Sequence, residues 1–356
     1  MAALASSDQI FVGDFAVKNR LFARISILLA CATVWAFSLA QAGELRVMVH
    51  DSFTLSKPLL SRFEADTGVK LRITKGGDAG EMLNKLILTR ANPIADVVYG
   101  IDNALAPKAL GAGVIDMDVR TAHTSLVPLP AGLVPVDYGY VMLNYDKAWF
   151  AKKGLALPKT LADLTQPPYA RLLTVPNPAT SSPGYAFLLA TIGALGEEGA
   201  FDWWARMRAN GIKVAKGWSE AYYTDFSRNG GRYPLVVSYA TSPAAEWFYA
   251  KDKPTEPATA SLAVLGGVFR QVEGVALVKG GKERMAAEKF IAFLRSASVQ
   301  QDLQTAMWMY PVVPDVARAE VMRFAPEPKT HDSPSDQDMV AKSSAWVARW
   351  TKVVLK

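Results

Sequence analysis

Short apolar segments with strand character alternate with amphipathic helices along this chain, and that alternation restricts the fold more than any other feature. Residues 44–50, 69–73 and 95–99 read as strands. The helices between them carry apolar residues at helical spacing: Leu59, Leu60 and Phe63 in the first, Met82, Leu83, Leu86 and Ile87 in the second. Strands separated by helices become parallel neighbours in a sheet. The chain is therefore predicted to be an α/β protein.

A second α/β set follows an extended apolar segment at 133–145, which we interpret as a crossover. Its predicted strands are 172–175, 212–214 and 234–238, and its predicted helices are 183–195 and 201–209. The run 261–269 and a strand at 273–278 are expected to return to the first set, followed by helices at 284–295 and 299–305. A last helix with Trp346 and Trp350 is expected to brace one lobe.

The length of 356 residues is more than one ordinary core accommodates and predicts about two lobes. The expected organisation is an N-terminal extension and signal at 1–42, a first lobe made of 43–135 and 266–315, a second lobe at 136–265 and a C-terminal helical brace at 316–356. Two α/β lobes joined by extended crossovers place a ligand in the cleft between them, where strand ends and helix N-termini converge.

The N-terminus is typical of a secretory signal. Lys18, Arg20 and Arg24 precede an apolar run at 25–40, and the small residues of Ala40–Ala42 fit a signal peptidase site. We expect cleavage after Ala42, export to the periplasm and a true start near Val17. A retained membrane anchor is an alternative, although the run is short for a membrane span.

The single cysteine, Cys31, lies inside this apolar run, so the exported chain has no thiol for a disulfide or a nucleophile. A lipoprotein site at Cys31 is a further alternative, but the bulky Leu29 two positions before the cysteine disfavours it. A formal charge of +6 is too mild to predict a nucleic-acid partner. The three histidines are scattered, which predicts no zinc site, and no cofactor is expected.

Asp78 lies in the glycine-rich turn 76–80, just before a predicted helix. Its carboxylate can face a cleft while the glycines let a ligand approach the backbone, or it can simply cap the helix. No Lys-Ser or Lys-Thr follows the glycines, so the turn is not a nucleotide-binding P-loop.

Two further segments, 180–184 and 238–243, place hydroxyl groups just before a helix whose first residue is expected to be proline. Such helix ends bind anions or polar ligand edges through free amide N–H groups. The same residues would also make ordinary helix caps, and both interpretations remain open.

Two tryptophans lie in loops where a core indole is less expected: Trp218 in the polar segment 216–220, and Trp308 before a proline-bounded loop. Flat rings at such positions can stack on aromatic or cationic ligands. The adjacent tyrosines Tyr222 and Tyr223 raise the alternative of a ferric ion held by phenolates, although no nearby set of histidine and carboxylate completes that site.

The blocks 51–53, 95–103, 136–140, 180–184, 216–222, 237–244 and 308–312, in that order, resemble the periplasmic thiamine-binding proteins of ABC transporters. The resemblance covers nearly all of the exported chain. It implies a two-lobed type II periplasmic binding fold with a central cleft. It also implies capture of thiamine, or its mono- or diphosphate, for delivery to an inner-membrane permease, with no enzymatic activity, and we expect a monomer.

The resemblance carries the family's ligand set onto positions of this chain. It implies an acidic turn at Asp78 and Ala79, a hydroxyl pair at Ser181 and Ser182, aromatic walls at Trp218 and Trp308, and a second helix-end loop formed by Tyr239, Ala240, Thr241, Ser242 and Pro243. Two departures stand out. Two residues after that proline, where the family can have an aromatic residue, this chain has Ala245, and Trp247 is a candidate substitute. The segment 54–58 is shorter than in the family, so the family's tryptophan after the first strand is missing.

Within that resemblance we expect Trp218, Tyr239 and Trp308 to wall the rings and Asp78 to pair with the cation or the amino group. The hydroxyls of Ser181, Ser182, Thr241 and Ser242 are expected at the hydroxyethyl or phosphate end. Two rivals remain: ferric-ion capture through Tyr222 and Tyr223, and a thiaminase-like enzyme, which the lack of a cysteine disfavours. The sequence leaves the phosphorylation state, the affinity, the permease and the extent of lobe closure open.

Overall fold

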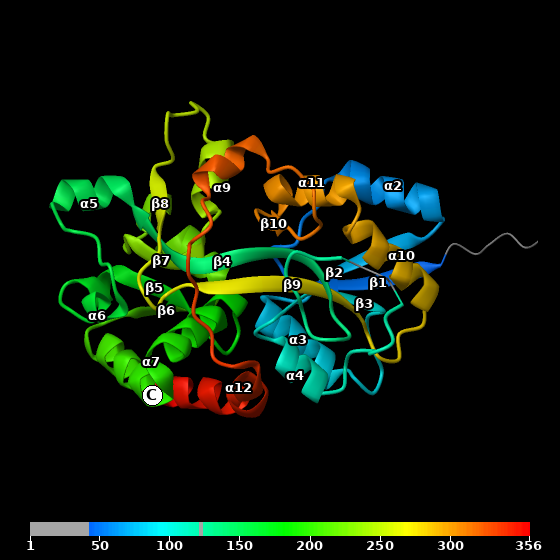
Figure 1. Ribbon diagram of the computed structural model, residues 1–356, viewed down its shortest axis with the longest axis horizontal. Helices are drawn as coiled ribbons and strands as arrows, with labels where there is room; N and C mark the ends of the chain where they lie inside the picture. Colours follow the sequence, from blue (N-terminus) through cyan, green and yellow to red (C-terminus); the bar gives the residue numbers. More distant parts are fainter. Residues whose placement is uncertain (1–42, 121–123) are drawn as a thin grey trace, which may run out of the picture. The chain divides into compact units, whose positions relative to one another are not determined.

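A computed structural model describes residues 43–120 and 124–356 of the chain. Its mixed α/β architecture confirms the predicted fold class (Figure 1). The predicted export signal, the cleavage site at Ala42 and Cys31 lie outside the described residues. Within the described residues, no helix combines the length and apolar character needed to cross a membrane.

The first lobe is built on three parallel strands in the order β2-β1-β3. These strands are β1 (Glu44–Val49), β2 (Lys70–Lys75) and β3 (Val97–Asp102). The intervening helices are α2 (Lys57–Thr67) and α3 (Ala79–Leu88), and α4 (Ala106–Gly111) follows β3. Helix α2 ends where Gly68 adopts φ 68°, a left-handed conformation that glycine accepts without strain. The predicted strands and helices of this region are therefore confirmed, with bounds shifted by one to three residues.

Two long strands connect the lobes through one continuous sheet, ordered β2-β1-β3-β9-β4-β7-β5-β6. Strand β4 (Val134–Asp146) pairs with β9 (Phe269–Leu277) along its first half and with β7 (Leu235–Tyr239) along its second half. Figure 1 shows β4 and β9 side by side through the middle of the molecule. The predicted crossover at 133–145 is thus β4, and the returning strand is β9.

The second lobe adds β5 (Leu173–Pro176), β6 (Lys213–Ala215) and β8 (Thr259–Leu262), while the short β10 (Tyr310–Pro311) pairs with β4. Its helices are α5 (Lys147–Lys153), α6 (Leu161–Leu164), α7 (Ser182–Ala209), α8 (Trp218–Glu220) and α9 (Ser242–Tyr249). The two helices predicted at 183–195 and 201–209 are confirmed: the span labelled α7 consists of two helices that meet at a kink, where Gly196 has non-helical angles (φ 71°, ψ 168°). The run predicted to be extended at 261–269 is only partly strand: β8 ends at Leu262 and β9 begins at Phe269.

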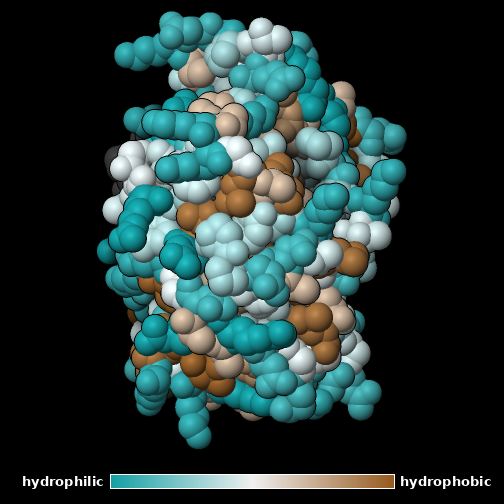
Figure 2. All heavy atoms as spheres, turned by 90° about the vertical axis from the view of Figure 1, so that its left-hand side faces the viewer, coloured by the Kyte–Doolittle hydropathy of each residue, from teal (hydrophilic) through white to brown (hydrophobic). Residues whose placement is uncertain are grey.

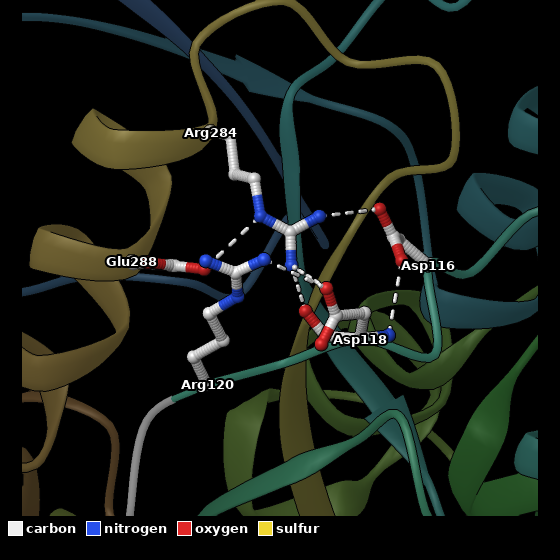
Figure 3. Close-up of polar contacts among 5 residues, drawn as sticks. All are labelled: Asp116, Asp118, Arg120, Arg284 and Glu288. Atoms are coloured by element: carbon white, nitrogen blue, oxygen red, sulfur yellow. Dashed lines mark hydrogen bonds and ion pairs between the residues drawn. The ribbon is translucent and has the colours of Figure 1, made fainter.

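Helices α10 (Arg284–Leu294) and α11 (Ala297–Ala306) confirm the next two predicted helices. Arg284 at the start of α10 is held by ion pairs to Asp116, Asp118 and Glu288 (Figure 3). Arg120 pairs with the same Asp118. This cluster fastens α10 to the segment that follows α4.

The C-terminal helix α12 (Asp336–Trp350) packs on both α4 and α7. It therefore spans the two lobes, which corrects the expectation that it braces only one. Trp350 is fully buried and meets Trp204 of α7 edge-on, with ring centroids 5.5 Å apart. At the end of the molecule that carries α5 and α6, the surface is mostly hydrophilic, with hydrophobic groups in separate small areas (Figure 2). The large aromatic side chains of α7 and α12 lie inside.

Candidate functional site

A cavity of about 360 Å³ lies between the two lobes, where the predicted cleft was expected. This volume is at the lower end of the roughly 300–1,000 Å³ typical of small-molecule sites. The first lobe contributes His50, Asp78, Glu273 and Trp308 to its wall, and the second contributes Ser182, Trp218, Tyr222, Tyr239, Thr241, Ser242 and Glu246. The cavity is therefore walled by aromatic rings, carboxylates and hydroxyls.

Asp78 lies just before α3. The sequence left open whether its carboxylate caps that helix or faces a ligand cleft. Its Oδ1 accepts hydrogen bonds from the backbone N–H of Ala79 (2.8 Å) and of Ser182 (3.2 Å), and its Oδ2 accepts one from the N–H of Trp218 (3.3 Å). It therefore caps α3, faces the cavity and bridges the two lobes. Gly80 makes the close approach possible, since a Cβ there would lie 2.7 Å from the carbonyl oxygen of Thr180.

The two predicted helix ends both meet the cavity, with one change in register. Helix α7 begins at Ser182 and α9 begins at Ser242, so the prolines occupy the second helical position rather than the first. Ser182, Thr241 and Ser242 line the cavity. Four other expected site residues lie behind its wall: Ala79, Ser181, Ala240 and Pro243 are all buried, and none is part of the lining.

Three aromatic residues expected at the site, Trp218, Tyr239 and Trp308, share this one cavity. Trp218 stacks on Tyr222 with ring centroids 5.2 Å apart and an interplanar angle of 16°. Its Nε1–H donates to the Oγ of Ser238 at 2.9 Å, which fixes the orientation of the indole. One face of Trp218 is thus covered by Tyr222, and Tyr239 approaches it edge-on at 6.2 Å.

Trp308 lies at the rim of the cavity against Phe248 and Tyr249, with ring centroids 5.3 and 5.7 Å away. Its φ of 60° is left-handed, a conformation that a bulky residue rarely adopts without a functional reason. Trp247 instead packs on Phe324 at 5.0 Å and does not line the cavity, so it does not replace the aromatic missing at Ala245.

Two residues that the sequence analysis did not single out, His50 and Glu273, lie side by side on the cavity wall. The Nε2 of His50 is 3.7 Å from Oε1 of Glu273, and both residues are buried. The one available signal was the charge of Glu273 at the start of the predicted apolar strand 273–278. Burial raises the pKa of Glu273, but the charge of His50 and hydrogen bonding, including that of Tyr99, together outweigh burial and hold the pKa below its usual range.

The cavity side of the sheet carries further buried acids. The hydroxyl of Tyr99 lies within hydrogen-bonding distance of both Oδ2 of Asp137 and Oε2 of Glu273, 3.1 Å from the latter, and its single proton is shared between them. Burial and the neighbouring charge of Glu273 raise the pKa of Asp137 well above its usual range.

The tyrosines of the ferric alternative occupy different environments. Tyr222 lies beneath Trp218 and donates its hydroxyl to Oε1 of Glu246 at 2.6 Å, whereas Tyr223 is 60% exposed. Burial and the charge of Glu246 raise the pKa of Tyr222 well above its usual value, which opposes the phenolate form that iron requires. Among the described residues, no group of three or more His, Cys, Asp or Glu is placed to hold a metal ion.

The chain matches the family model described as "Bacterial extracellular solute-binding protein" over residues 92–339. It is 32% identical over 339 residues to the "Thiamine-binding periplasmic protein" of Salmonella typhimurium strain LT2, covering 93% of this chain and 98% of that relative. A solved "Periplasmic thiamin binding protein" superposes with a TM-score of 0.77 at 30% identity, covering 87% of this chain and 96% of the other.

A "Ferric binding protein from Campylobacter jejuni" is also similar in structure, with a TM-score of 0.69 over 87% of this chain and 99% of that one. The identity is 18%, so this likeness shows the fold alone. The two-lobed periplasmic binding fold is therefore common to binders of different solutes, and the residues in the cavity must distinguish between them.

Proposed function

This chain belongs to the family of bacterial extracellular solute-binding proteins, and from that premise we propose that it captures thiamine, or its mono- or diphosphate, and delivers it to the permease of an ABC transporter. The relatives named as thiamine-binding support this proposal over most of their length. Capture and delivery involve no bond-making step, so the protein is proposed to be a binder and not an enzyme.

One observation carries the choice of ligand: aromatic faces and carboxylates line the same cavity. Trp218, Tyr239 and Trp308 offer rings, while Asp78 and Glu273 offer negative charge. Thiamine combines a thiazolium cation with a flat aminopyrimidine. Stacking and cation–π contacts contribute about 0.5–2 kcal/mol each and favour such a ligand over a neutral aliphatic solute.

The polar end of the ligand is proposed to lie at the starts of α7 and α9. Ser182, Thr241 and Ser242 bring hydroxyls there, and Arg228 adds a cation to the same cavity. Free amide N–H groups at helix starts and a guanidinium both suit a phosphate ester. The buried Ser181, Ala79, Ala240 and Pro243 are proposed to act from behind this wall, by fixing the shape of the loops.

Isothermal titration of the mature protein with thiamine, thiamine monophosphate and thiamine diphosphate tests the proposal. We expect saturable one-to-one binding of at least one of the three. Absence of binding to all three would remove the proposed function. The order of the three affinities determines whether Arg228 and the helix ends hold a phosphate or only the hydroxyethyl group.

Two alternatives have distinct signatures. Ferric capture through Tyr222 and Tyr223 predicts a visible phenolate-to-iron absorption band on addition of ferric salt, with affinity unchanged by Trp218→Ala. A thiaminase-like activity predicts turnover of thiamine. It lacks its nucleophile in an exported chain, because the only cysteine is Cys31.

The remaining parts of the proposal concern the whole protein. It is proposed to act as a monomer in the periplasm after removal of residues 1–42, with a first lobe made of 43–135 and 266–315 and a second lobe at 136–265. The segment 316–356 is proposed to brace both lobes through α12, which contacts α4 and α7.

A further inference from the structure

Glu273 presents a buried carboxylate with unused capacity to the cavity. Its Oε2 accepts the hydroxyl of Tyr99 at 3.1 Å. Its Oε1 has only a distant amide, Nε2 of Gln271 at 3.4 Å, and the imidazole of His50 at 3.7 Å. Glu273 is 3% exposed, and a buried charge without close partners is costly. This oxygen is therefore suited to accept a cation from the cavity.

Among the described residues, His50 is the basic side chain that pairs with Glu273. The hydrogen bonding of its imidazole is incomplete. Its Nε2 is buried without a hydrogen bond, and its ring lines the same cavity. Gly100 of β3 makes room for the ring, because a Cβ at that position would lie 2.4 Å from Cδ2 of His50. The imidazole is thus held close to Glu273 by packing and charge rather than by a direct hydrogen bond.

Asp78, the acidic residue expected from the sequence to meet the cation, differs from Glu273 in its hydrogen bonding. Its two oxygens already accept three backbone N–H groups, from Ala79, Ser182 and Trp218. Asp137 lies behind Glu273, within reach of the same Tyr99 hydroxyl, and is not part of the cavity lining. Of the acids on this side of the cavity, Glu273 therefore retains both a negative charge and an oxygen free to bind.

We propose that Glu273 is the carboxylate that neutralises the positive charge of the ligand, and that His50 serves as its counter-ion until the ligand arrives. This deepens, and rests on, the proposed capture of a thiazolium cation. Two positive charges cannot share one carboxylate at low cost, so ligand entry expels the proton of His50. The imidazolium loses its proton to solvent, the imidazole stays neutral, and the ligand cation takes its place beside Glu273.

The surroundings of His50 favour a protonated imidazole before binding. Burial lowers the pKa of His50, but the negative charges of Glu273, Asp78 and Asp51 outweigh it and raise the pKa above the usual value. The hydroxyl of Tyr99 is neutral, and its ring lies 5.6 Å from the imidazole. Across the adjoining part of the cleft, Glu81 faces Lys216, whose Nζ is 3.9 Å away.

The sign of the pH dependence follows from this proton release. Below the pKa of His50 in the free protein, the ligand competes with a proton, so its affinity rises with pH by up to about tenfold per unit. Above that pKa the imidazole is already neutral, and the affinity becomes independent of pH. The dependence is confined to the interval between the pKa of His50 in the complex and its raised value in the free protein.

Calorimetric titration with thiamine at pH 6.5, in two buffers of different ionisation enthalpy, measures the protons released per ligand. We expect wild-type protein to release up to one proton from His50, and His50→Gln to lack that release. Asp102, whose pKa burial raises to about 7 and which interacts with the charge of Glu273, can also lose a proton beside a cation. The comparison is therefore repeated in Asp102→Asn, where the added His50→Gln change should leave no proton release and equal binding across pH 6–8. The matched control is His331→Gln, a histidine beside Tyr140 and outside the cavity lining, which should release protons as the wild type does.

Glu273→Gln tests the counter-ion itself, with the neutral thiamine analogue in which thiophene replaces thiazolium as a second probe. At pH 7.5 we expect this variant to bind thiamine about 10- to 100-fold more weakly while its affinity for the neutral analogue changes less than threefold. Wild-type protein that binds thiamine without proton release and without pH dependence overturns the inference and leaves the proposed function intact. Wild-type protein that binds no thiamine at any pH overturns both.

Discussion

At the scale of single residues, Asp78 combines two roles that sequence reasoning could only weigh against each other. It caps α3 and also receives the N–H groups of Ser182 and Trp218 from the opposite lobe. A short polar residue before a helix identifies a cap from sequence alone. The second role depends on loops that lie more than a hundred residues away and on the glycine at 80 that lets them approach.

The two roles of Asp78 can be separated by substitution. Asp78→Ser keeps a capping oxygen, so we expect the free energy of unfolding to change by less than about 0.5 kcal/mol, whereas Asp78→Ala costs about 0.5–2 kcal/mol. Both variants lose the bridge to the second lobe and should bind thiamine at least about tenfold more weakly. Denaturant unfolding and calorimetric titration measure the two effects, and equal affinity of Asp78→Ser and wild type would refute the bridging role.

Trp218 is the second residue whose contribution can be isolated. Its indole is oriented by Ser238 and supported by Tyr222, so Trp218→Ala removes a preformed stacking surface. A loss of about 1–2 kcal/mol corresponds to roughly 5- to 30-fold weaker thiamine binding. Trp247→Ala is the control, since this indole packs on Phe324 outside the cavity. Equal losses in the two variants would argue against stacking at Trp218.

The limits of sequence reasoning are clearest in Glu273 and His50. Trp218 and Trp308 were identified because an indole in a polar loop or before a proline is unusual. Glu273 lies within β9 and His50 directly follows β1, and neither belongs to a recognisable motif. They become neighbours only because β9 joins the sheet beside β3, a pairing that local sequence patterns do not encode.

At the scale of elements, the helices and strands were largely predictable, but their partners were not. The period of apolar residues located α2 and α3, and the two helices predicted separately at 183–195 and 201–209 meet at the kink of Gly196 within α7. Helix α12 shows the difference. Its aromatic residues predicted a packed helix, yet its contacts with both α4 and α7 depend on where the whole chain returns.

Removal of the α12 anchor should destabilise the protein strongly. Trp350 is fully buried against Trp204, so Trp350→Ala leaves a large cavity and is expected to cost roughly 3–5 kcal/mol of unfolding free energy. Val340 is on the same helix and is 70% exposed, so Val340→Ala should change stability by less than about 0.5 kcal/mol. Urea denaturation of the two variants distinguishes an anchoring helix from a loosely attached one, for which both losses would be small.

At the scale of the whole molecule, the two lobes meet around a concentration of buried acid. Asp102 at the end of β3 is fully buried, and its Oδ2 has no hydrogen-bond partner. Burial, with a smaller contribution from the charge of Glu273, raises the pKa of Asp102 to about 7 against the opposing effect of the hydrogen bond from Leu105. The lobes therefore come together at a cost in electrostatic energy that a cationic ligand can relieve.

This cost makes stability depend on pH. The folded protein holds a proton on Asp102 that the unfolded chain, with a pKa near 3.8, has lost, so the contribution of Asp102 to stability falls as pH rises from about 4 to about 7. Asp102→Asn removes the charge and keeps the acceptor for Leu105. We expect it to stabilise the protein at pH 8 relative to wild type, with a smaller gain at pH 5. Guanidinium unfolding at the two pH values measures this difference, and an equal effect at both would contradict it.

The placement of the indoles has a practical consequence. Trp203, Trp204, Trp346 and Trp350 are sealed inside, whereas Trp218 and Trp308 border the cavity from opposite lobes. A flat cation lodged between those two would quench their emission and leave the sealed four as a constant background. The unlabelled protein would then serve as an optical sensor for the vitamin, with its internal reference built in.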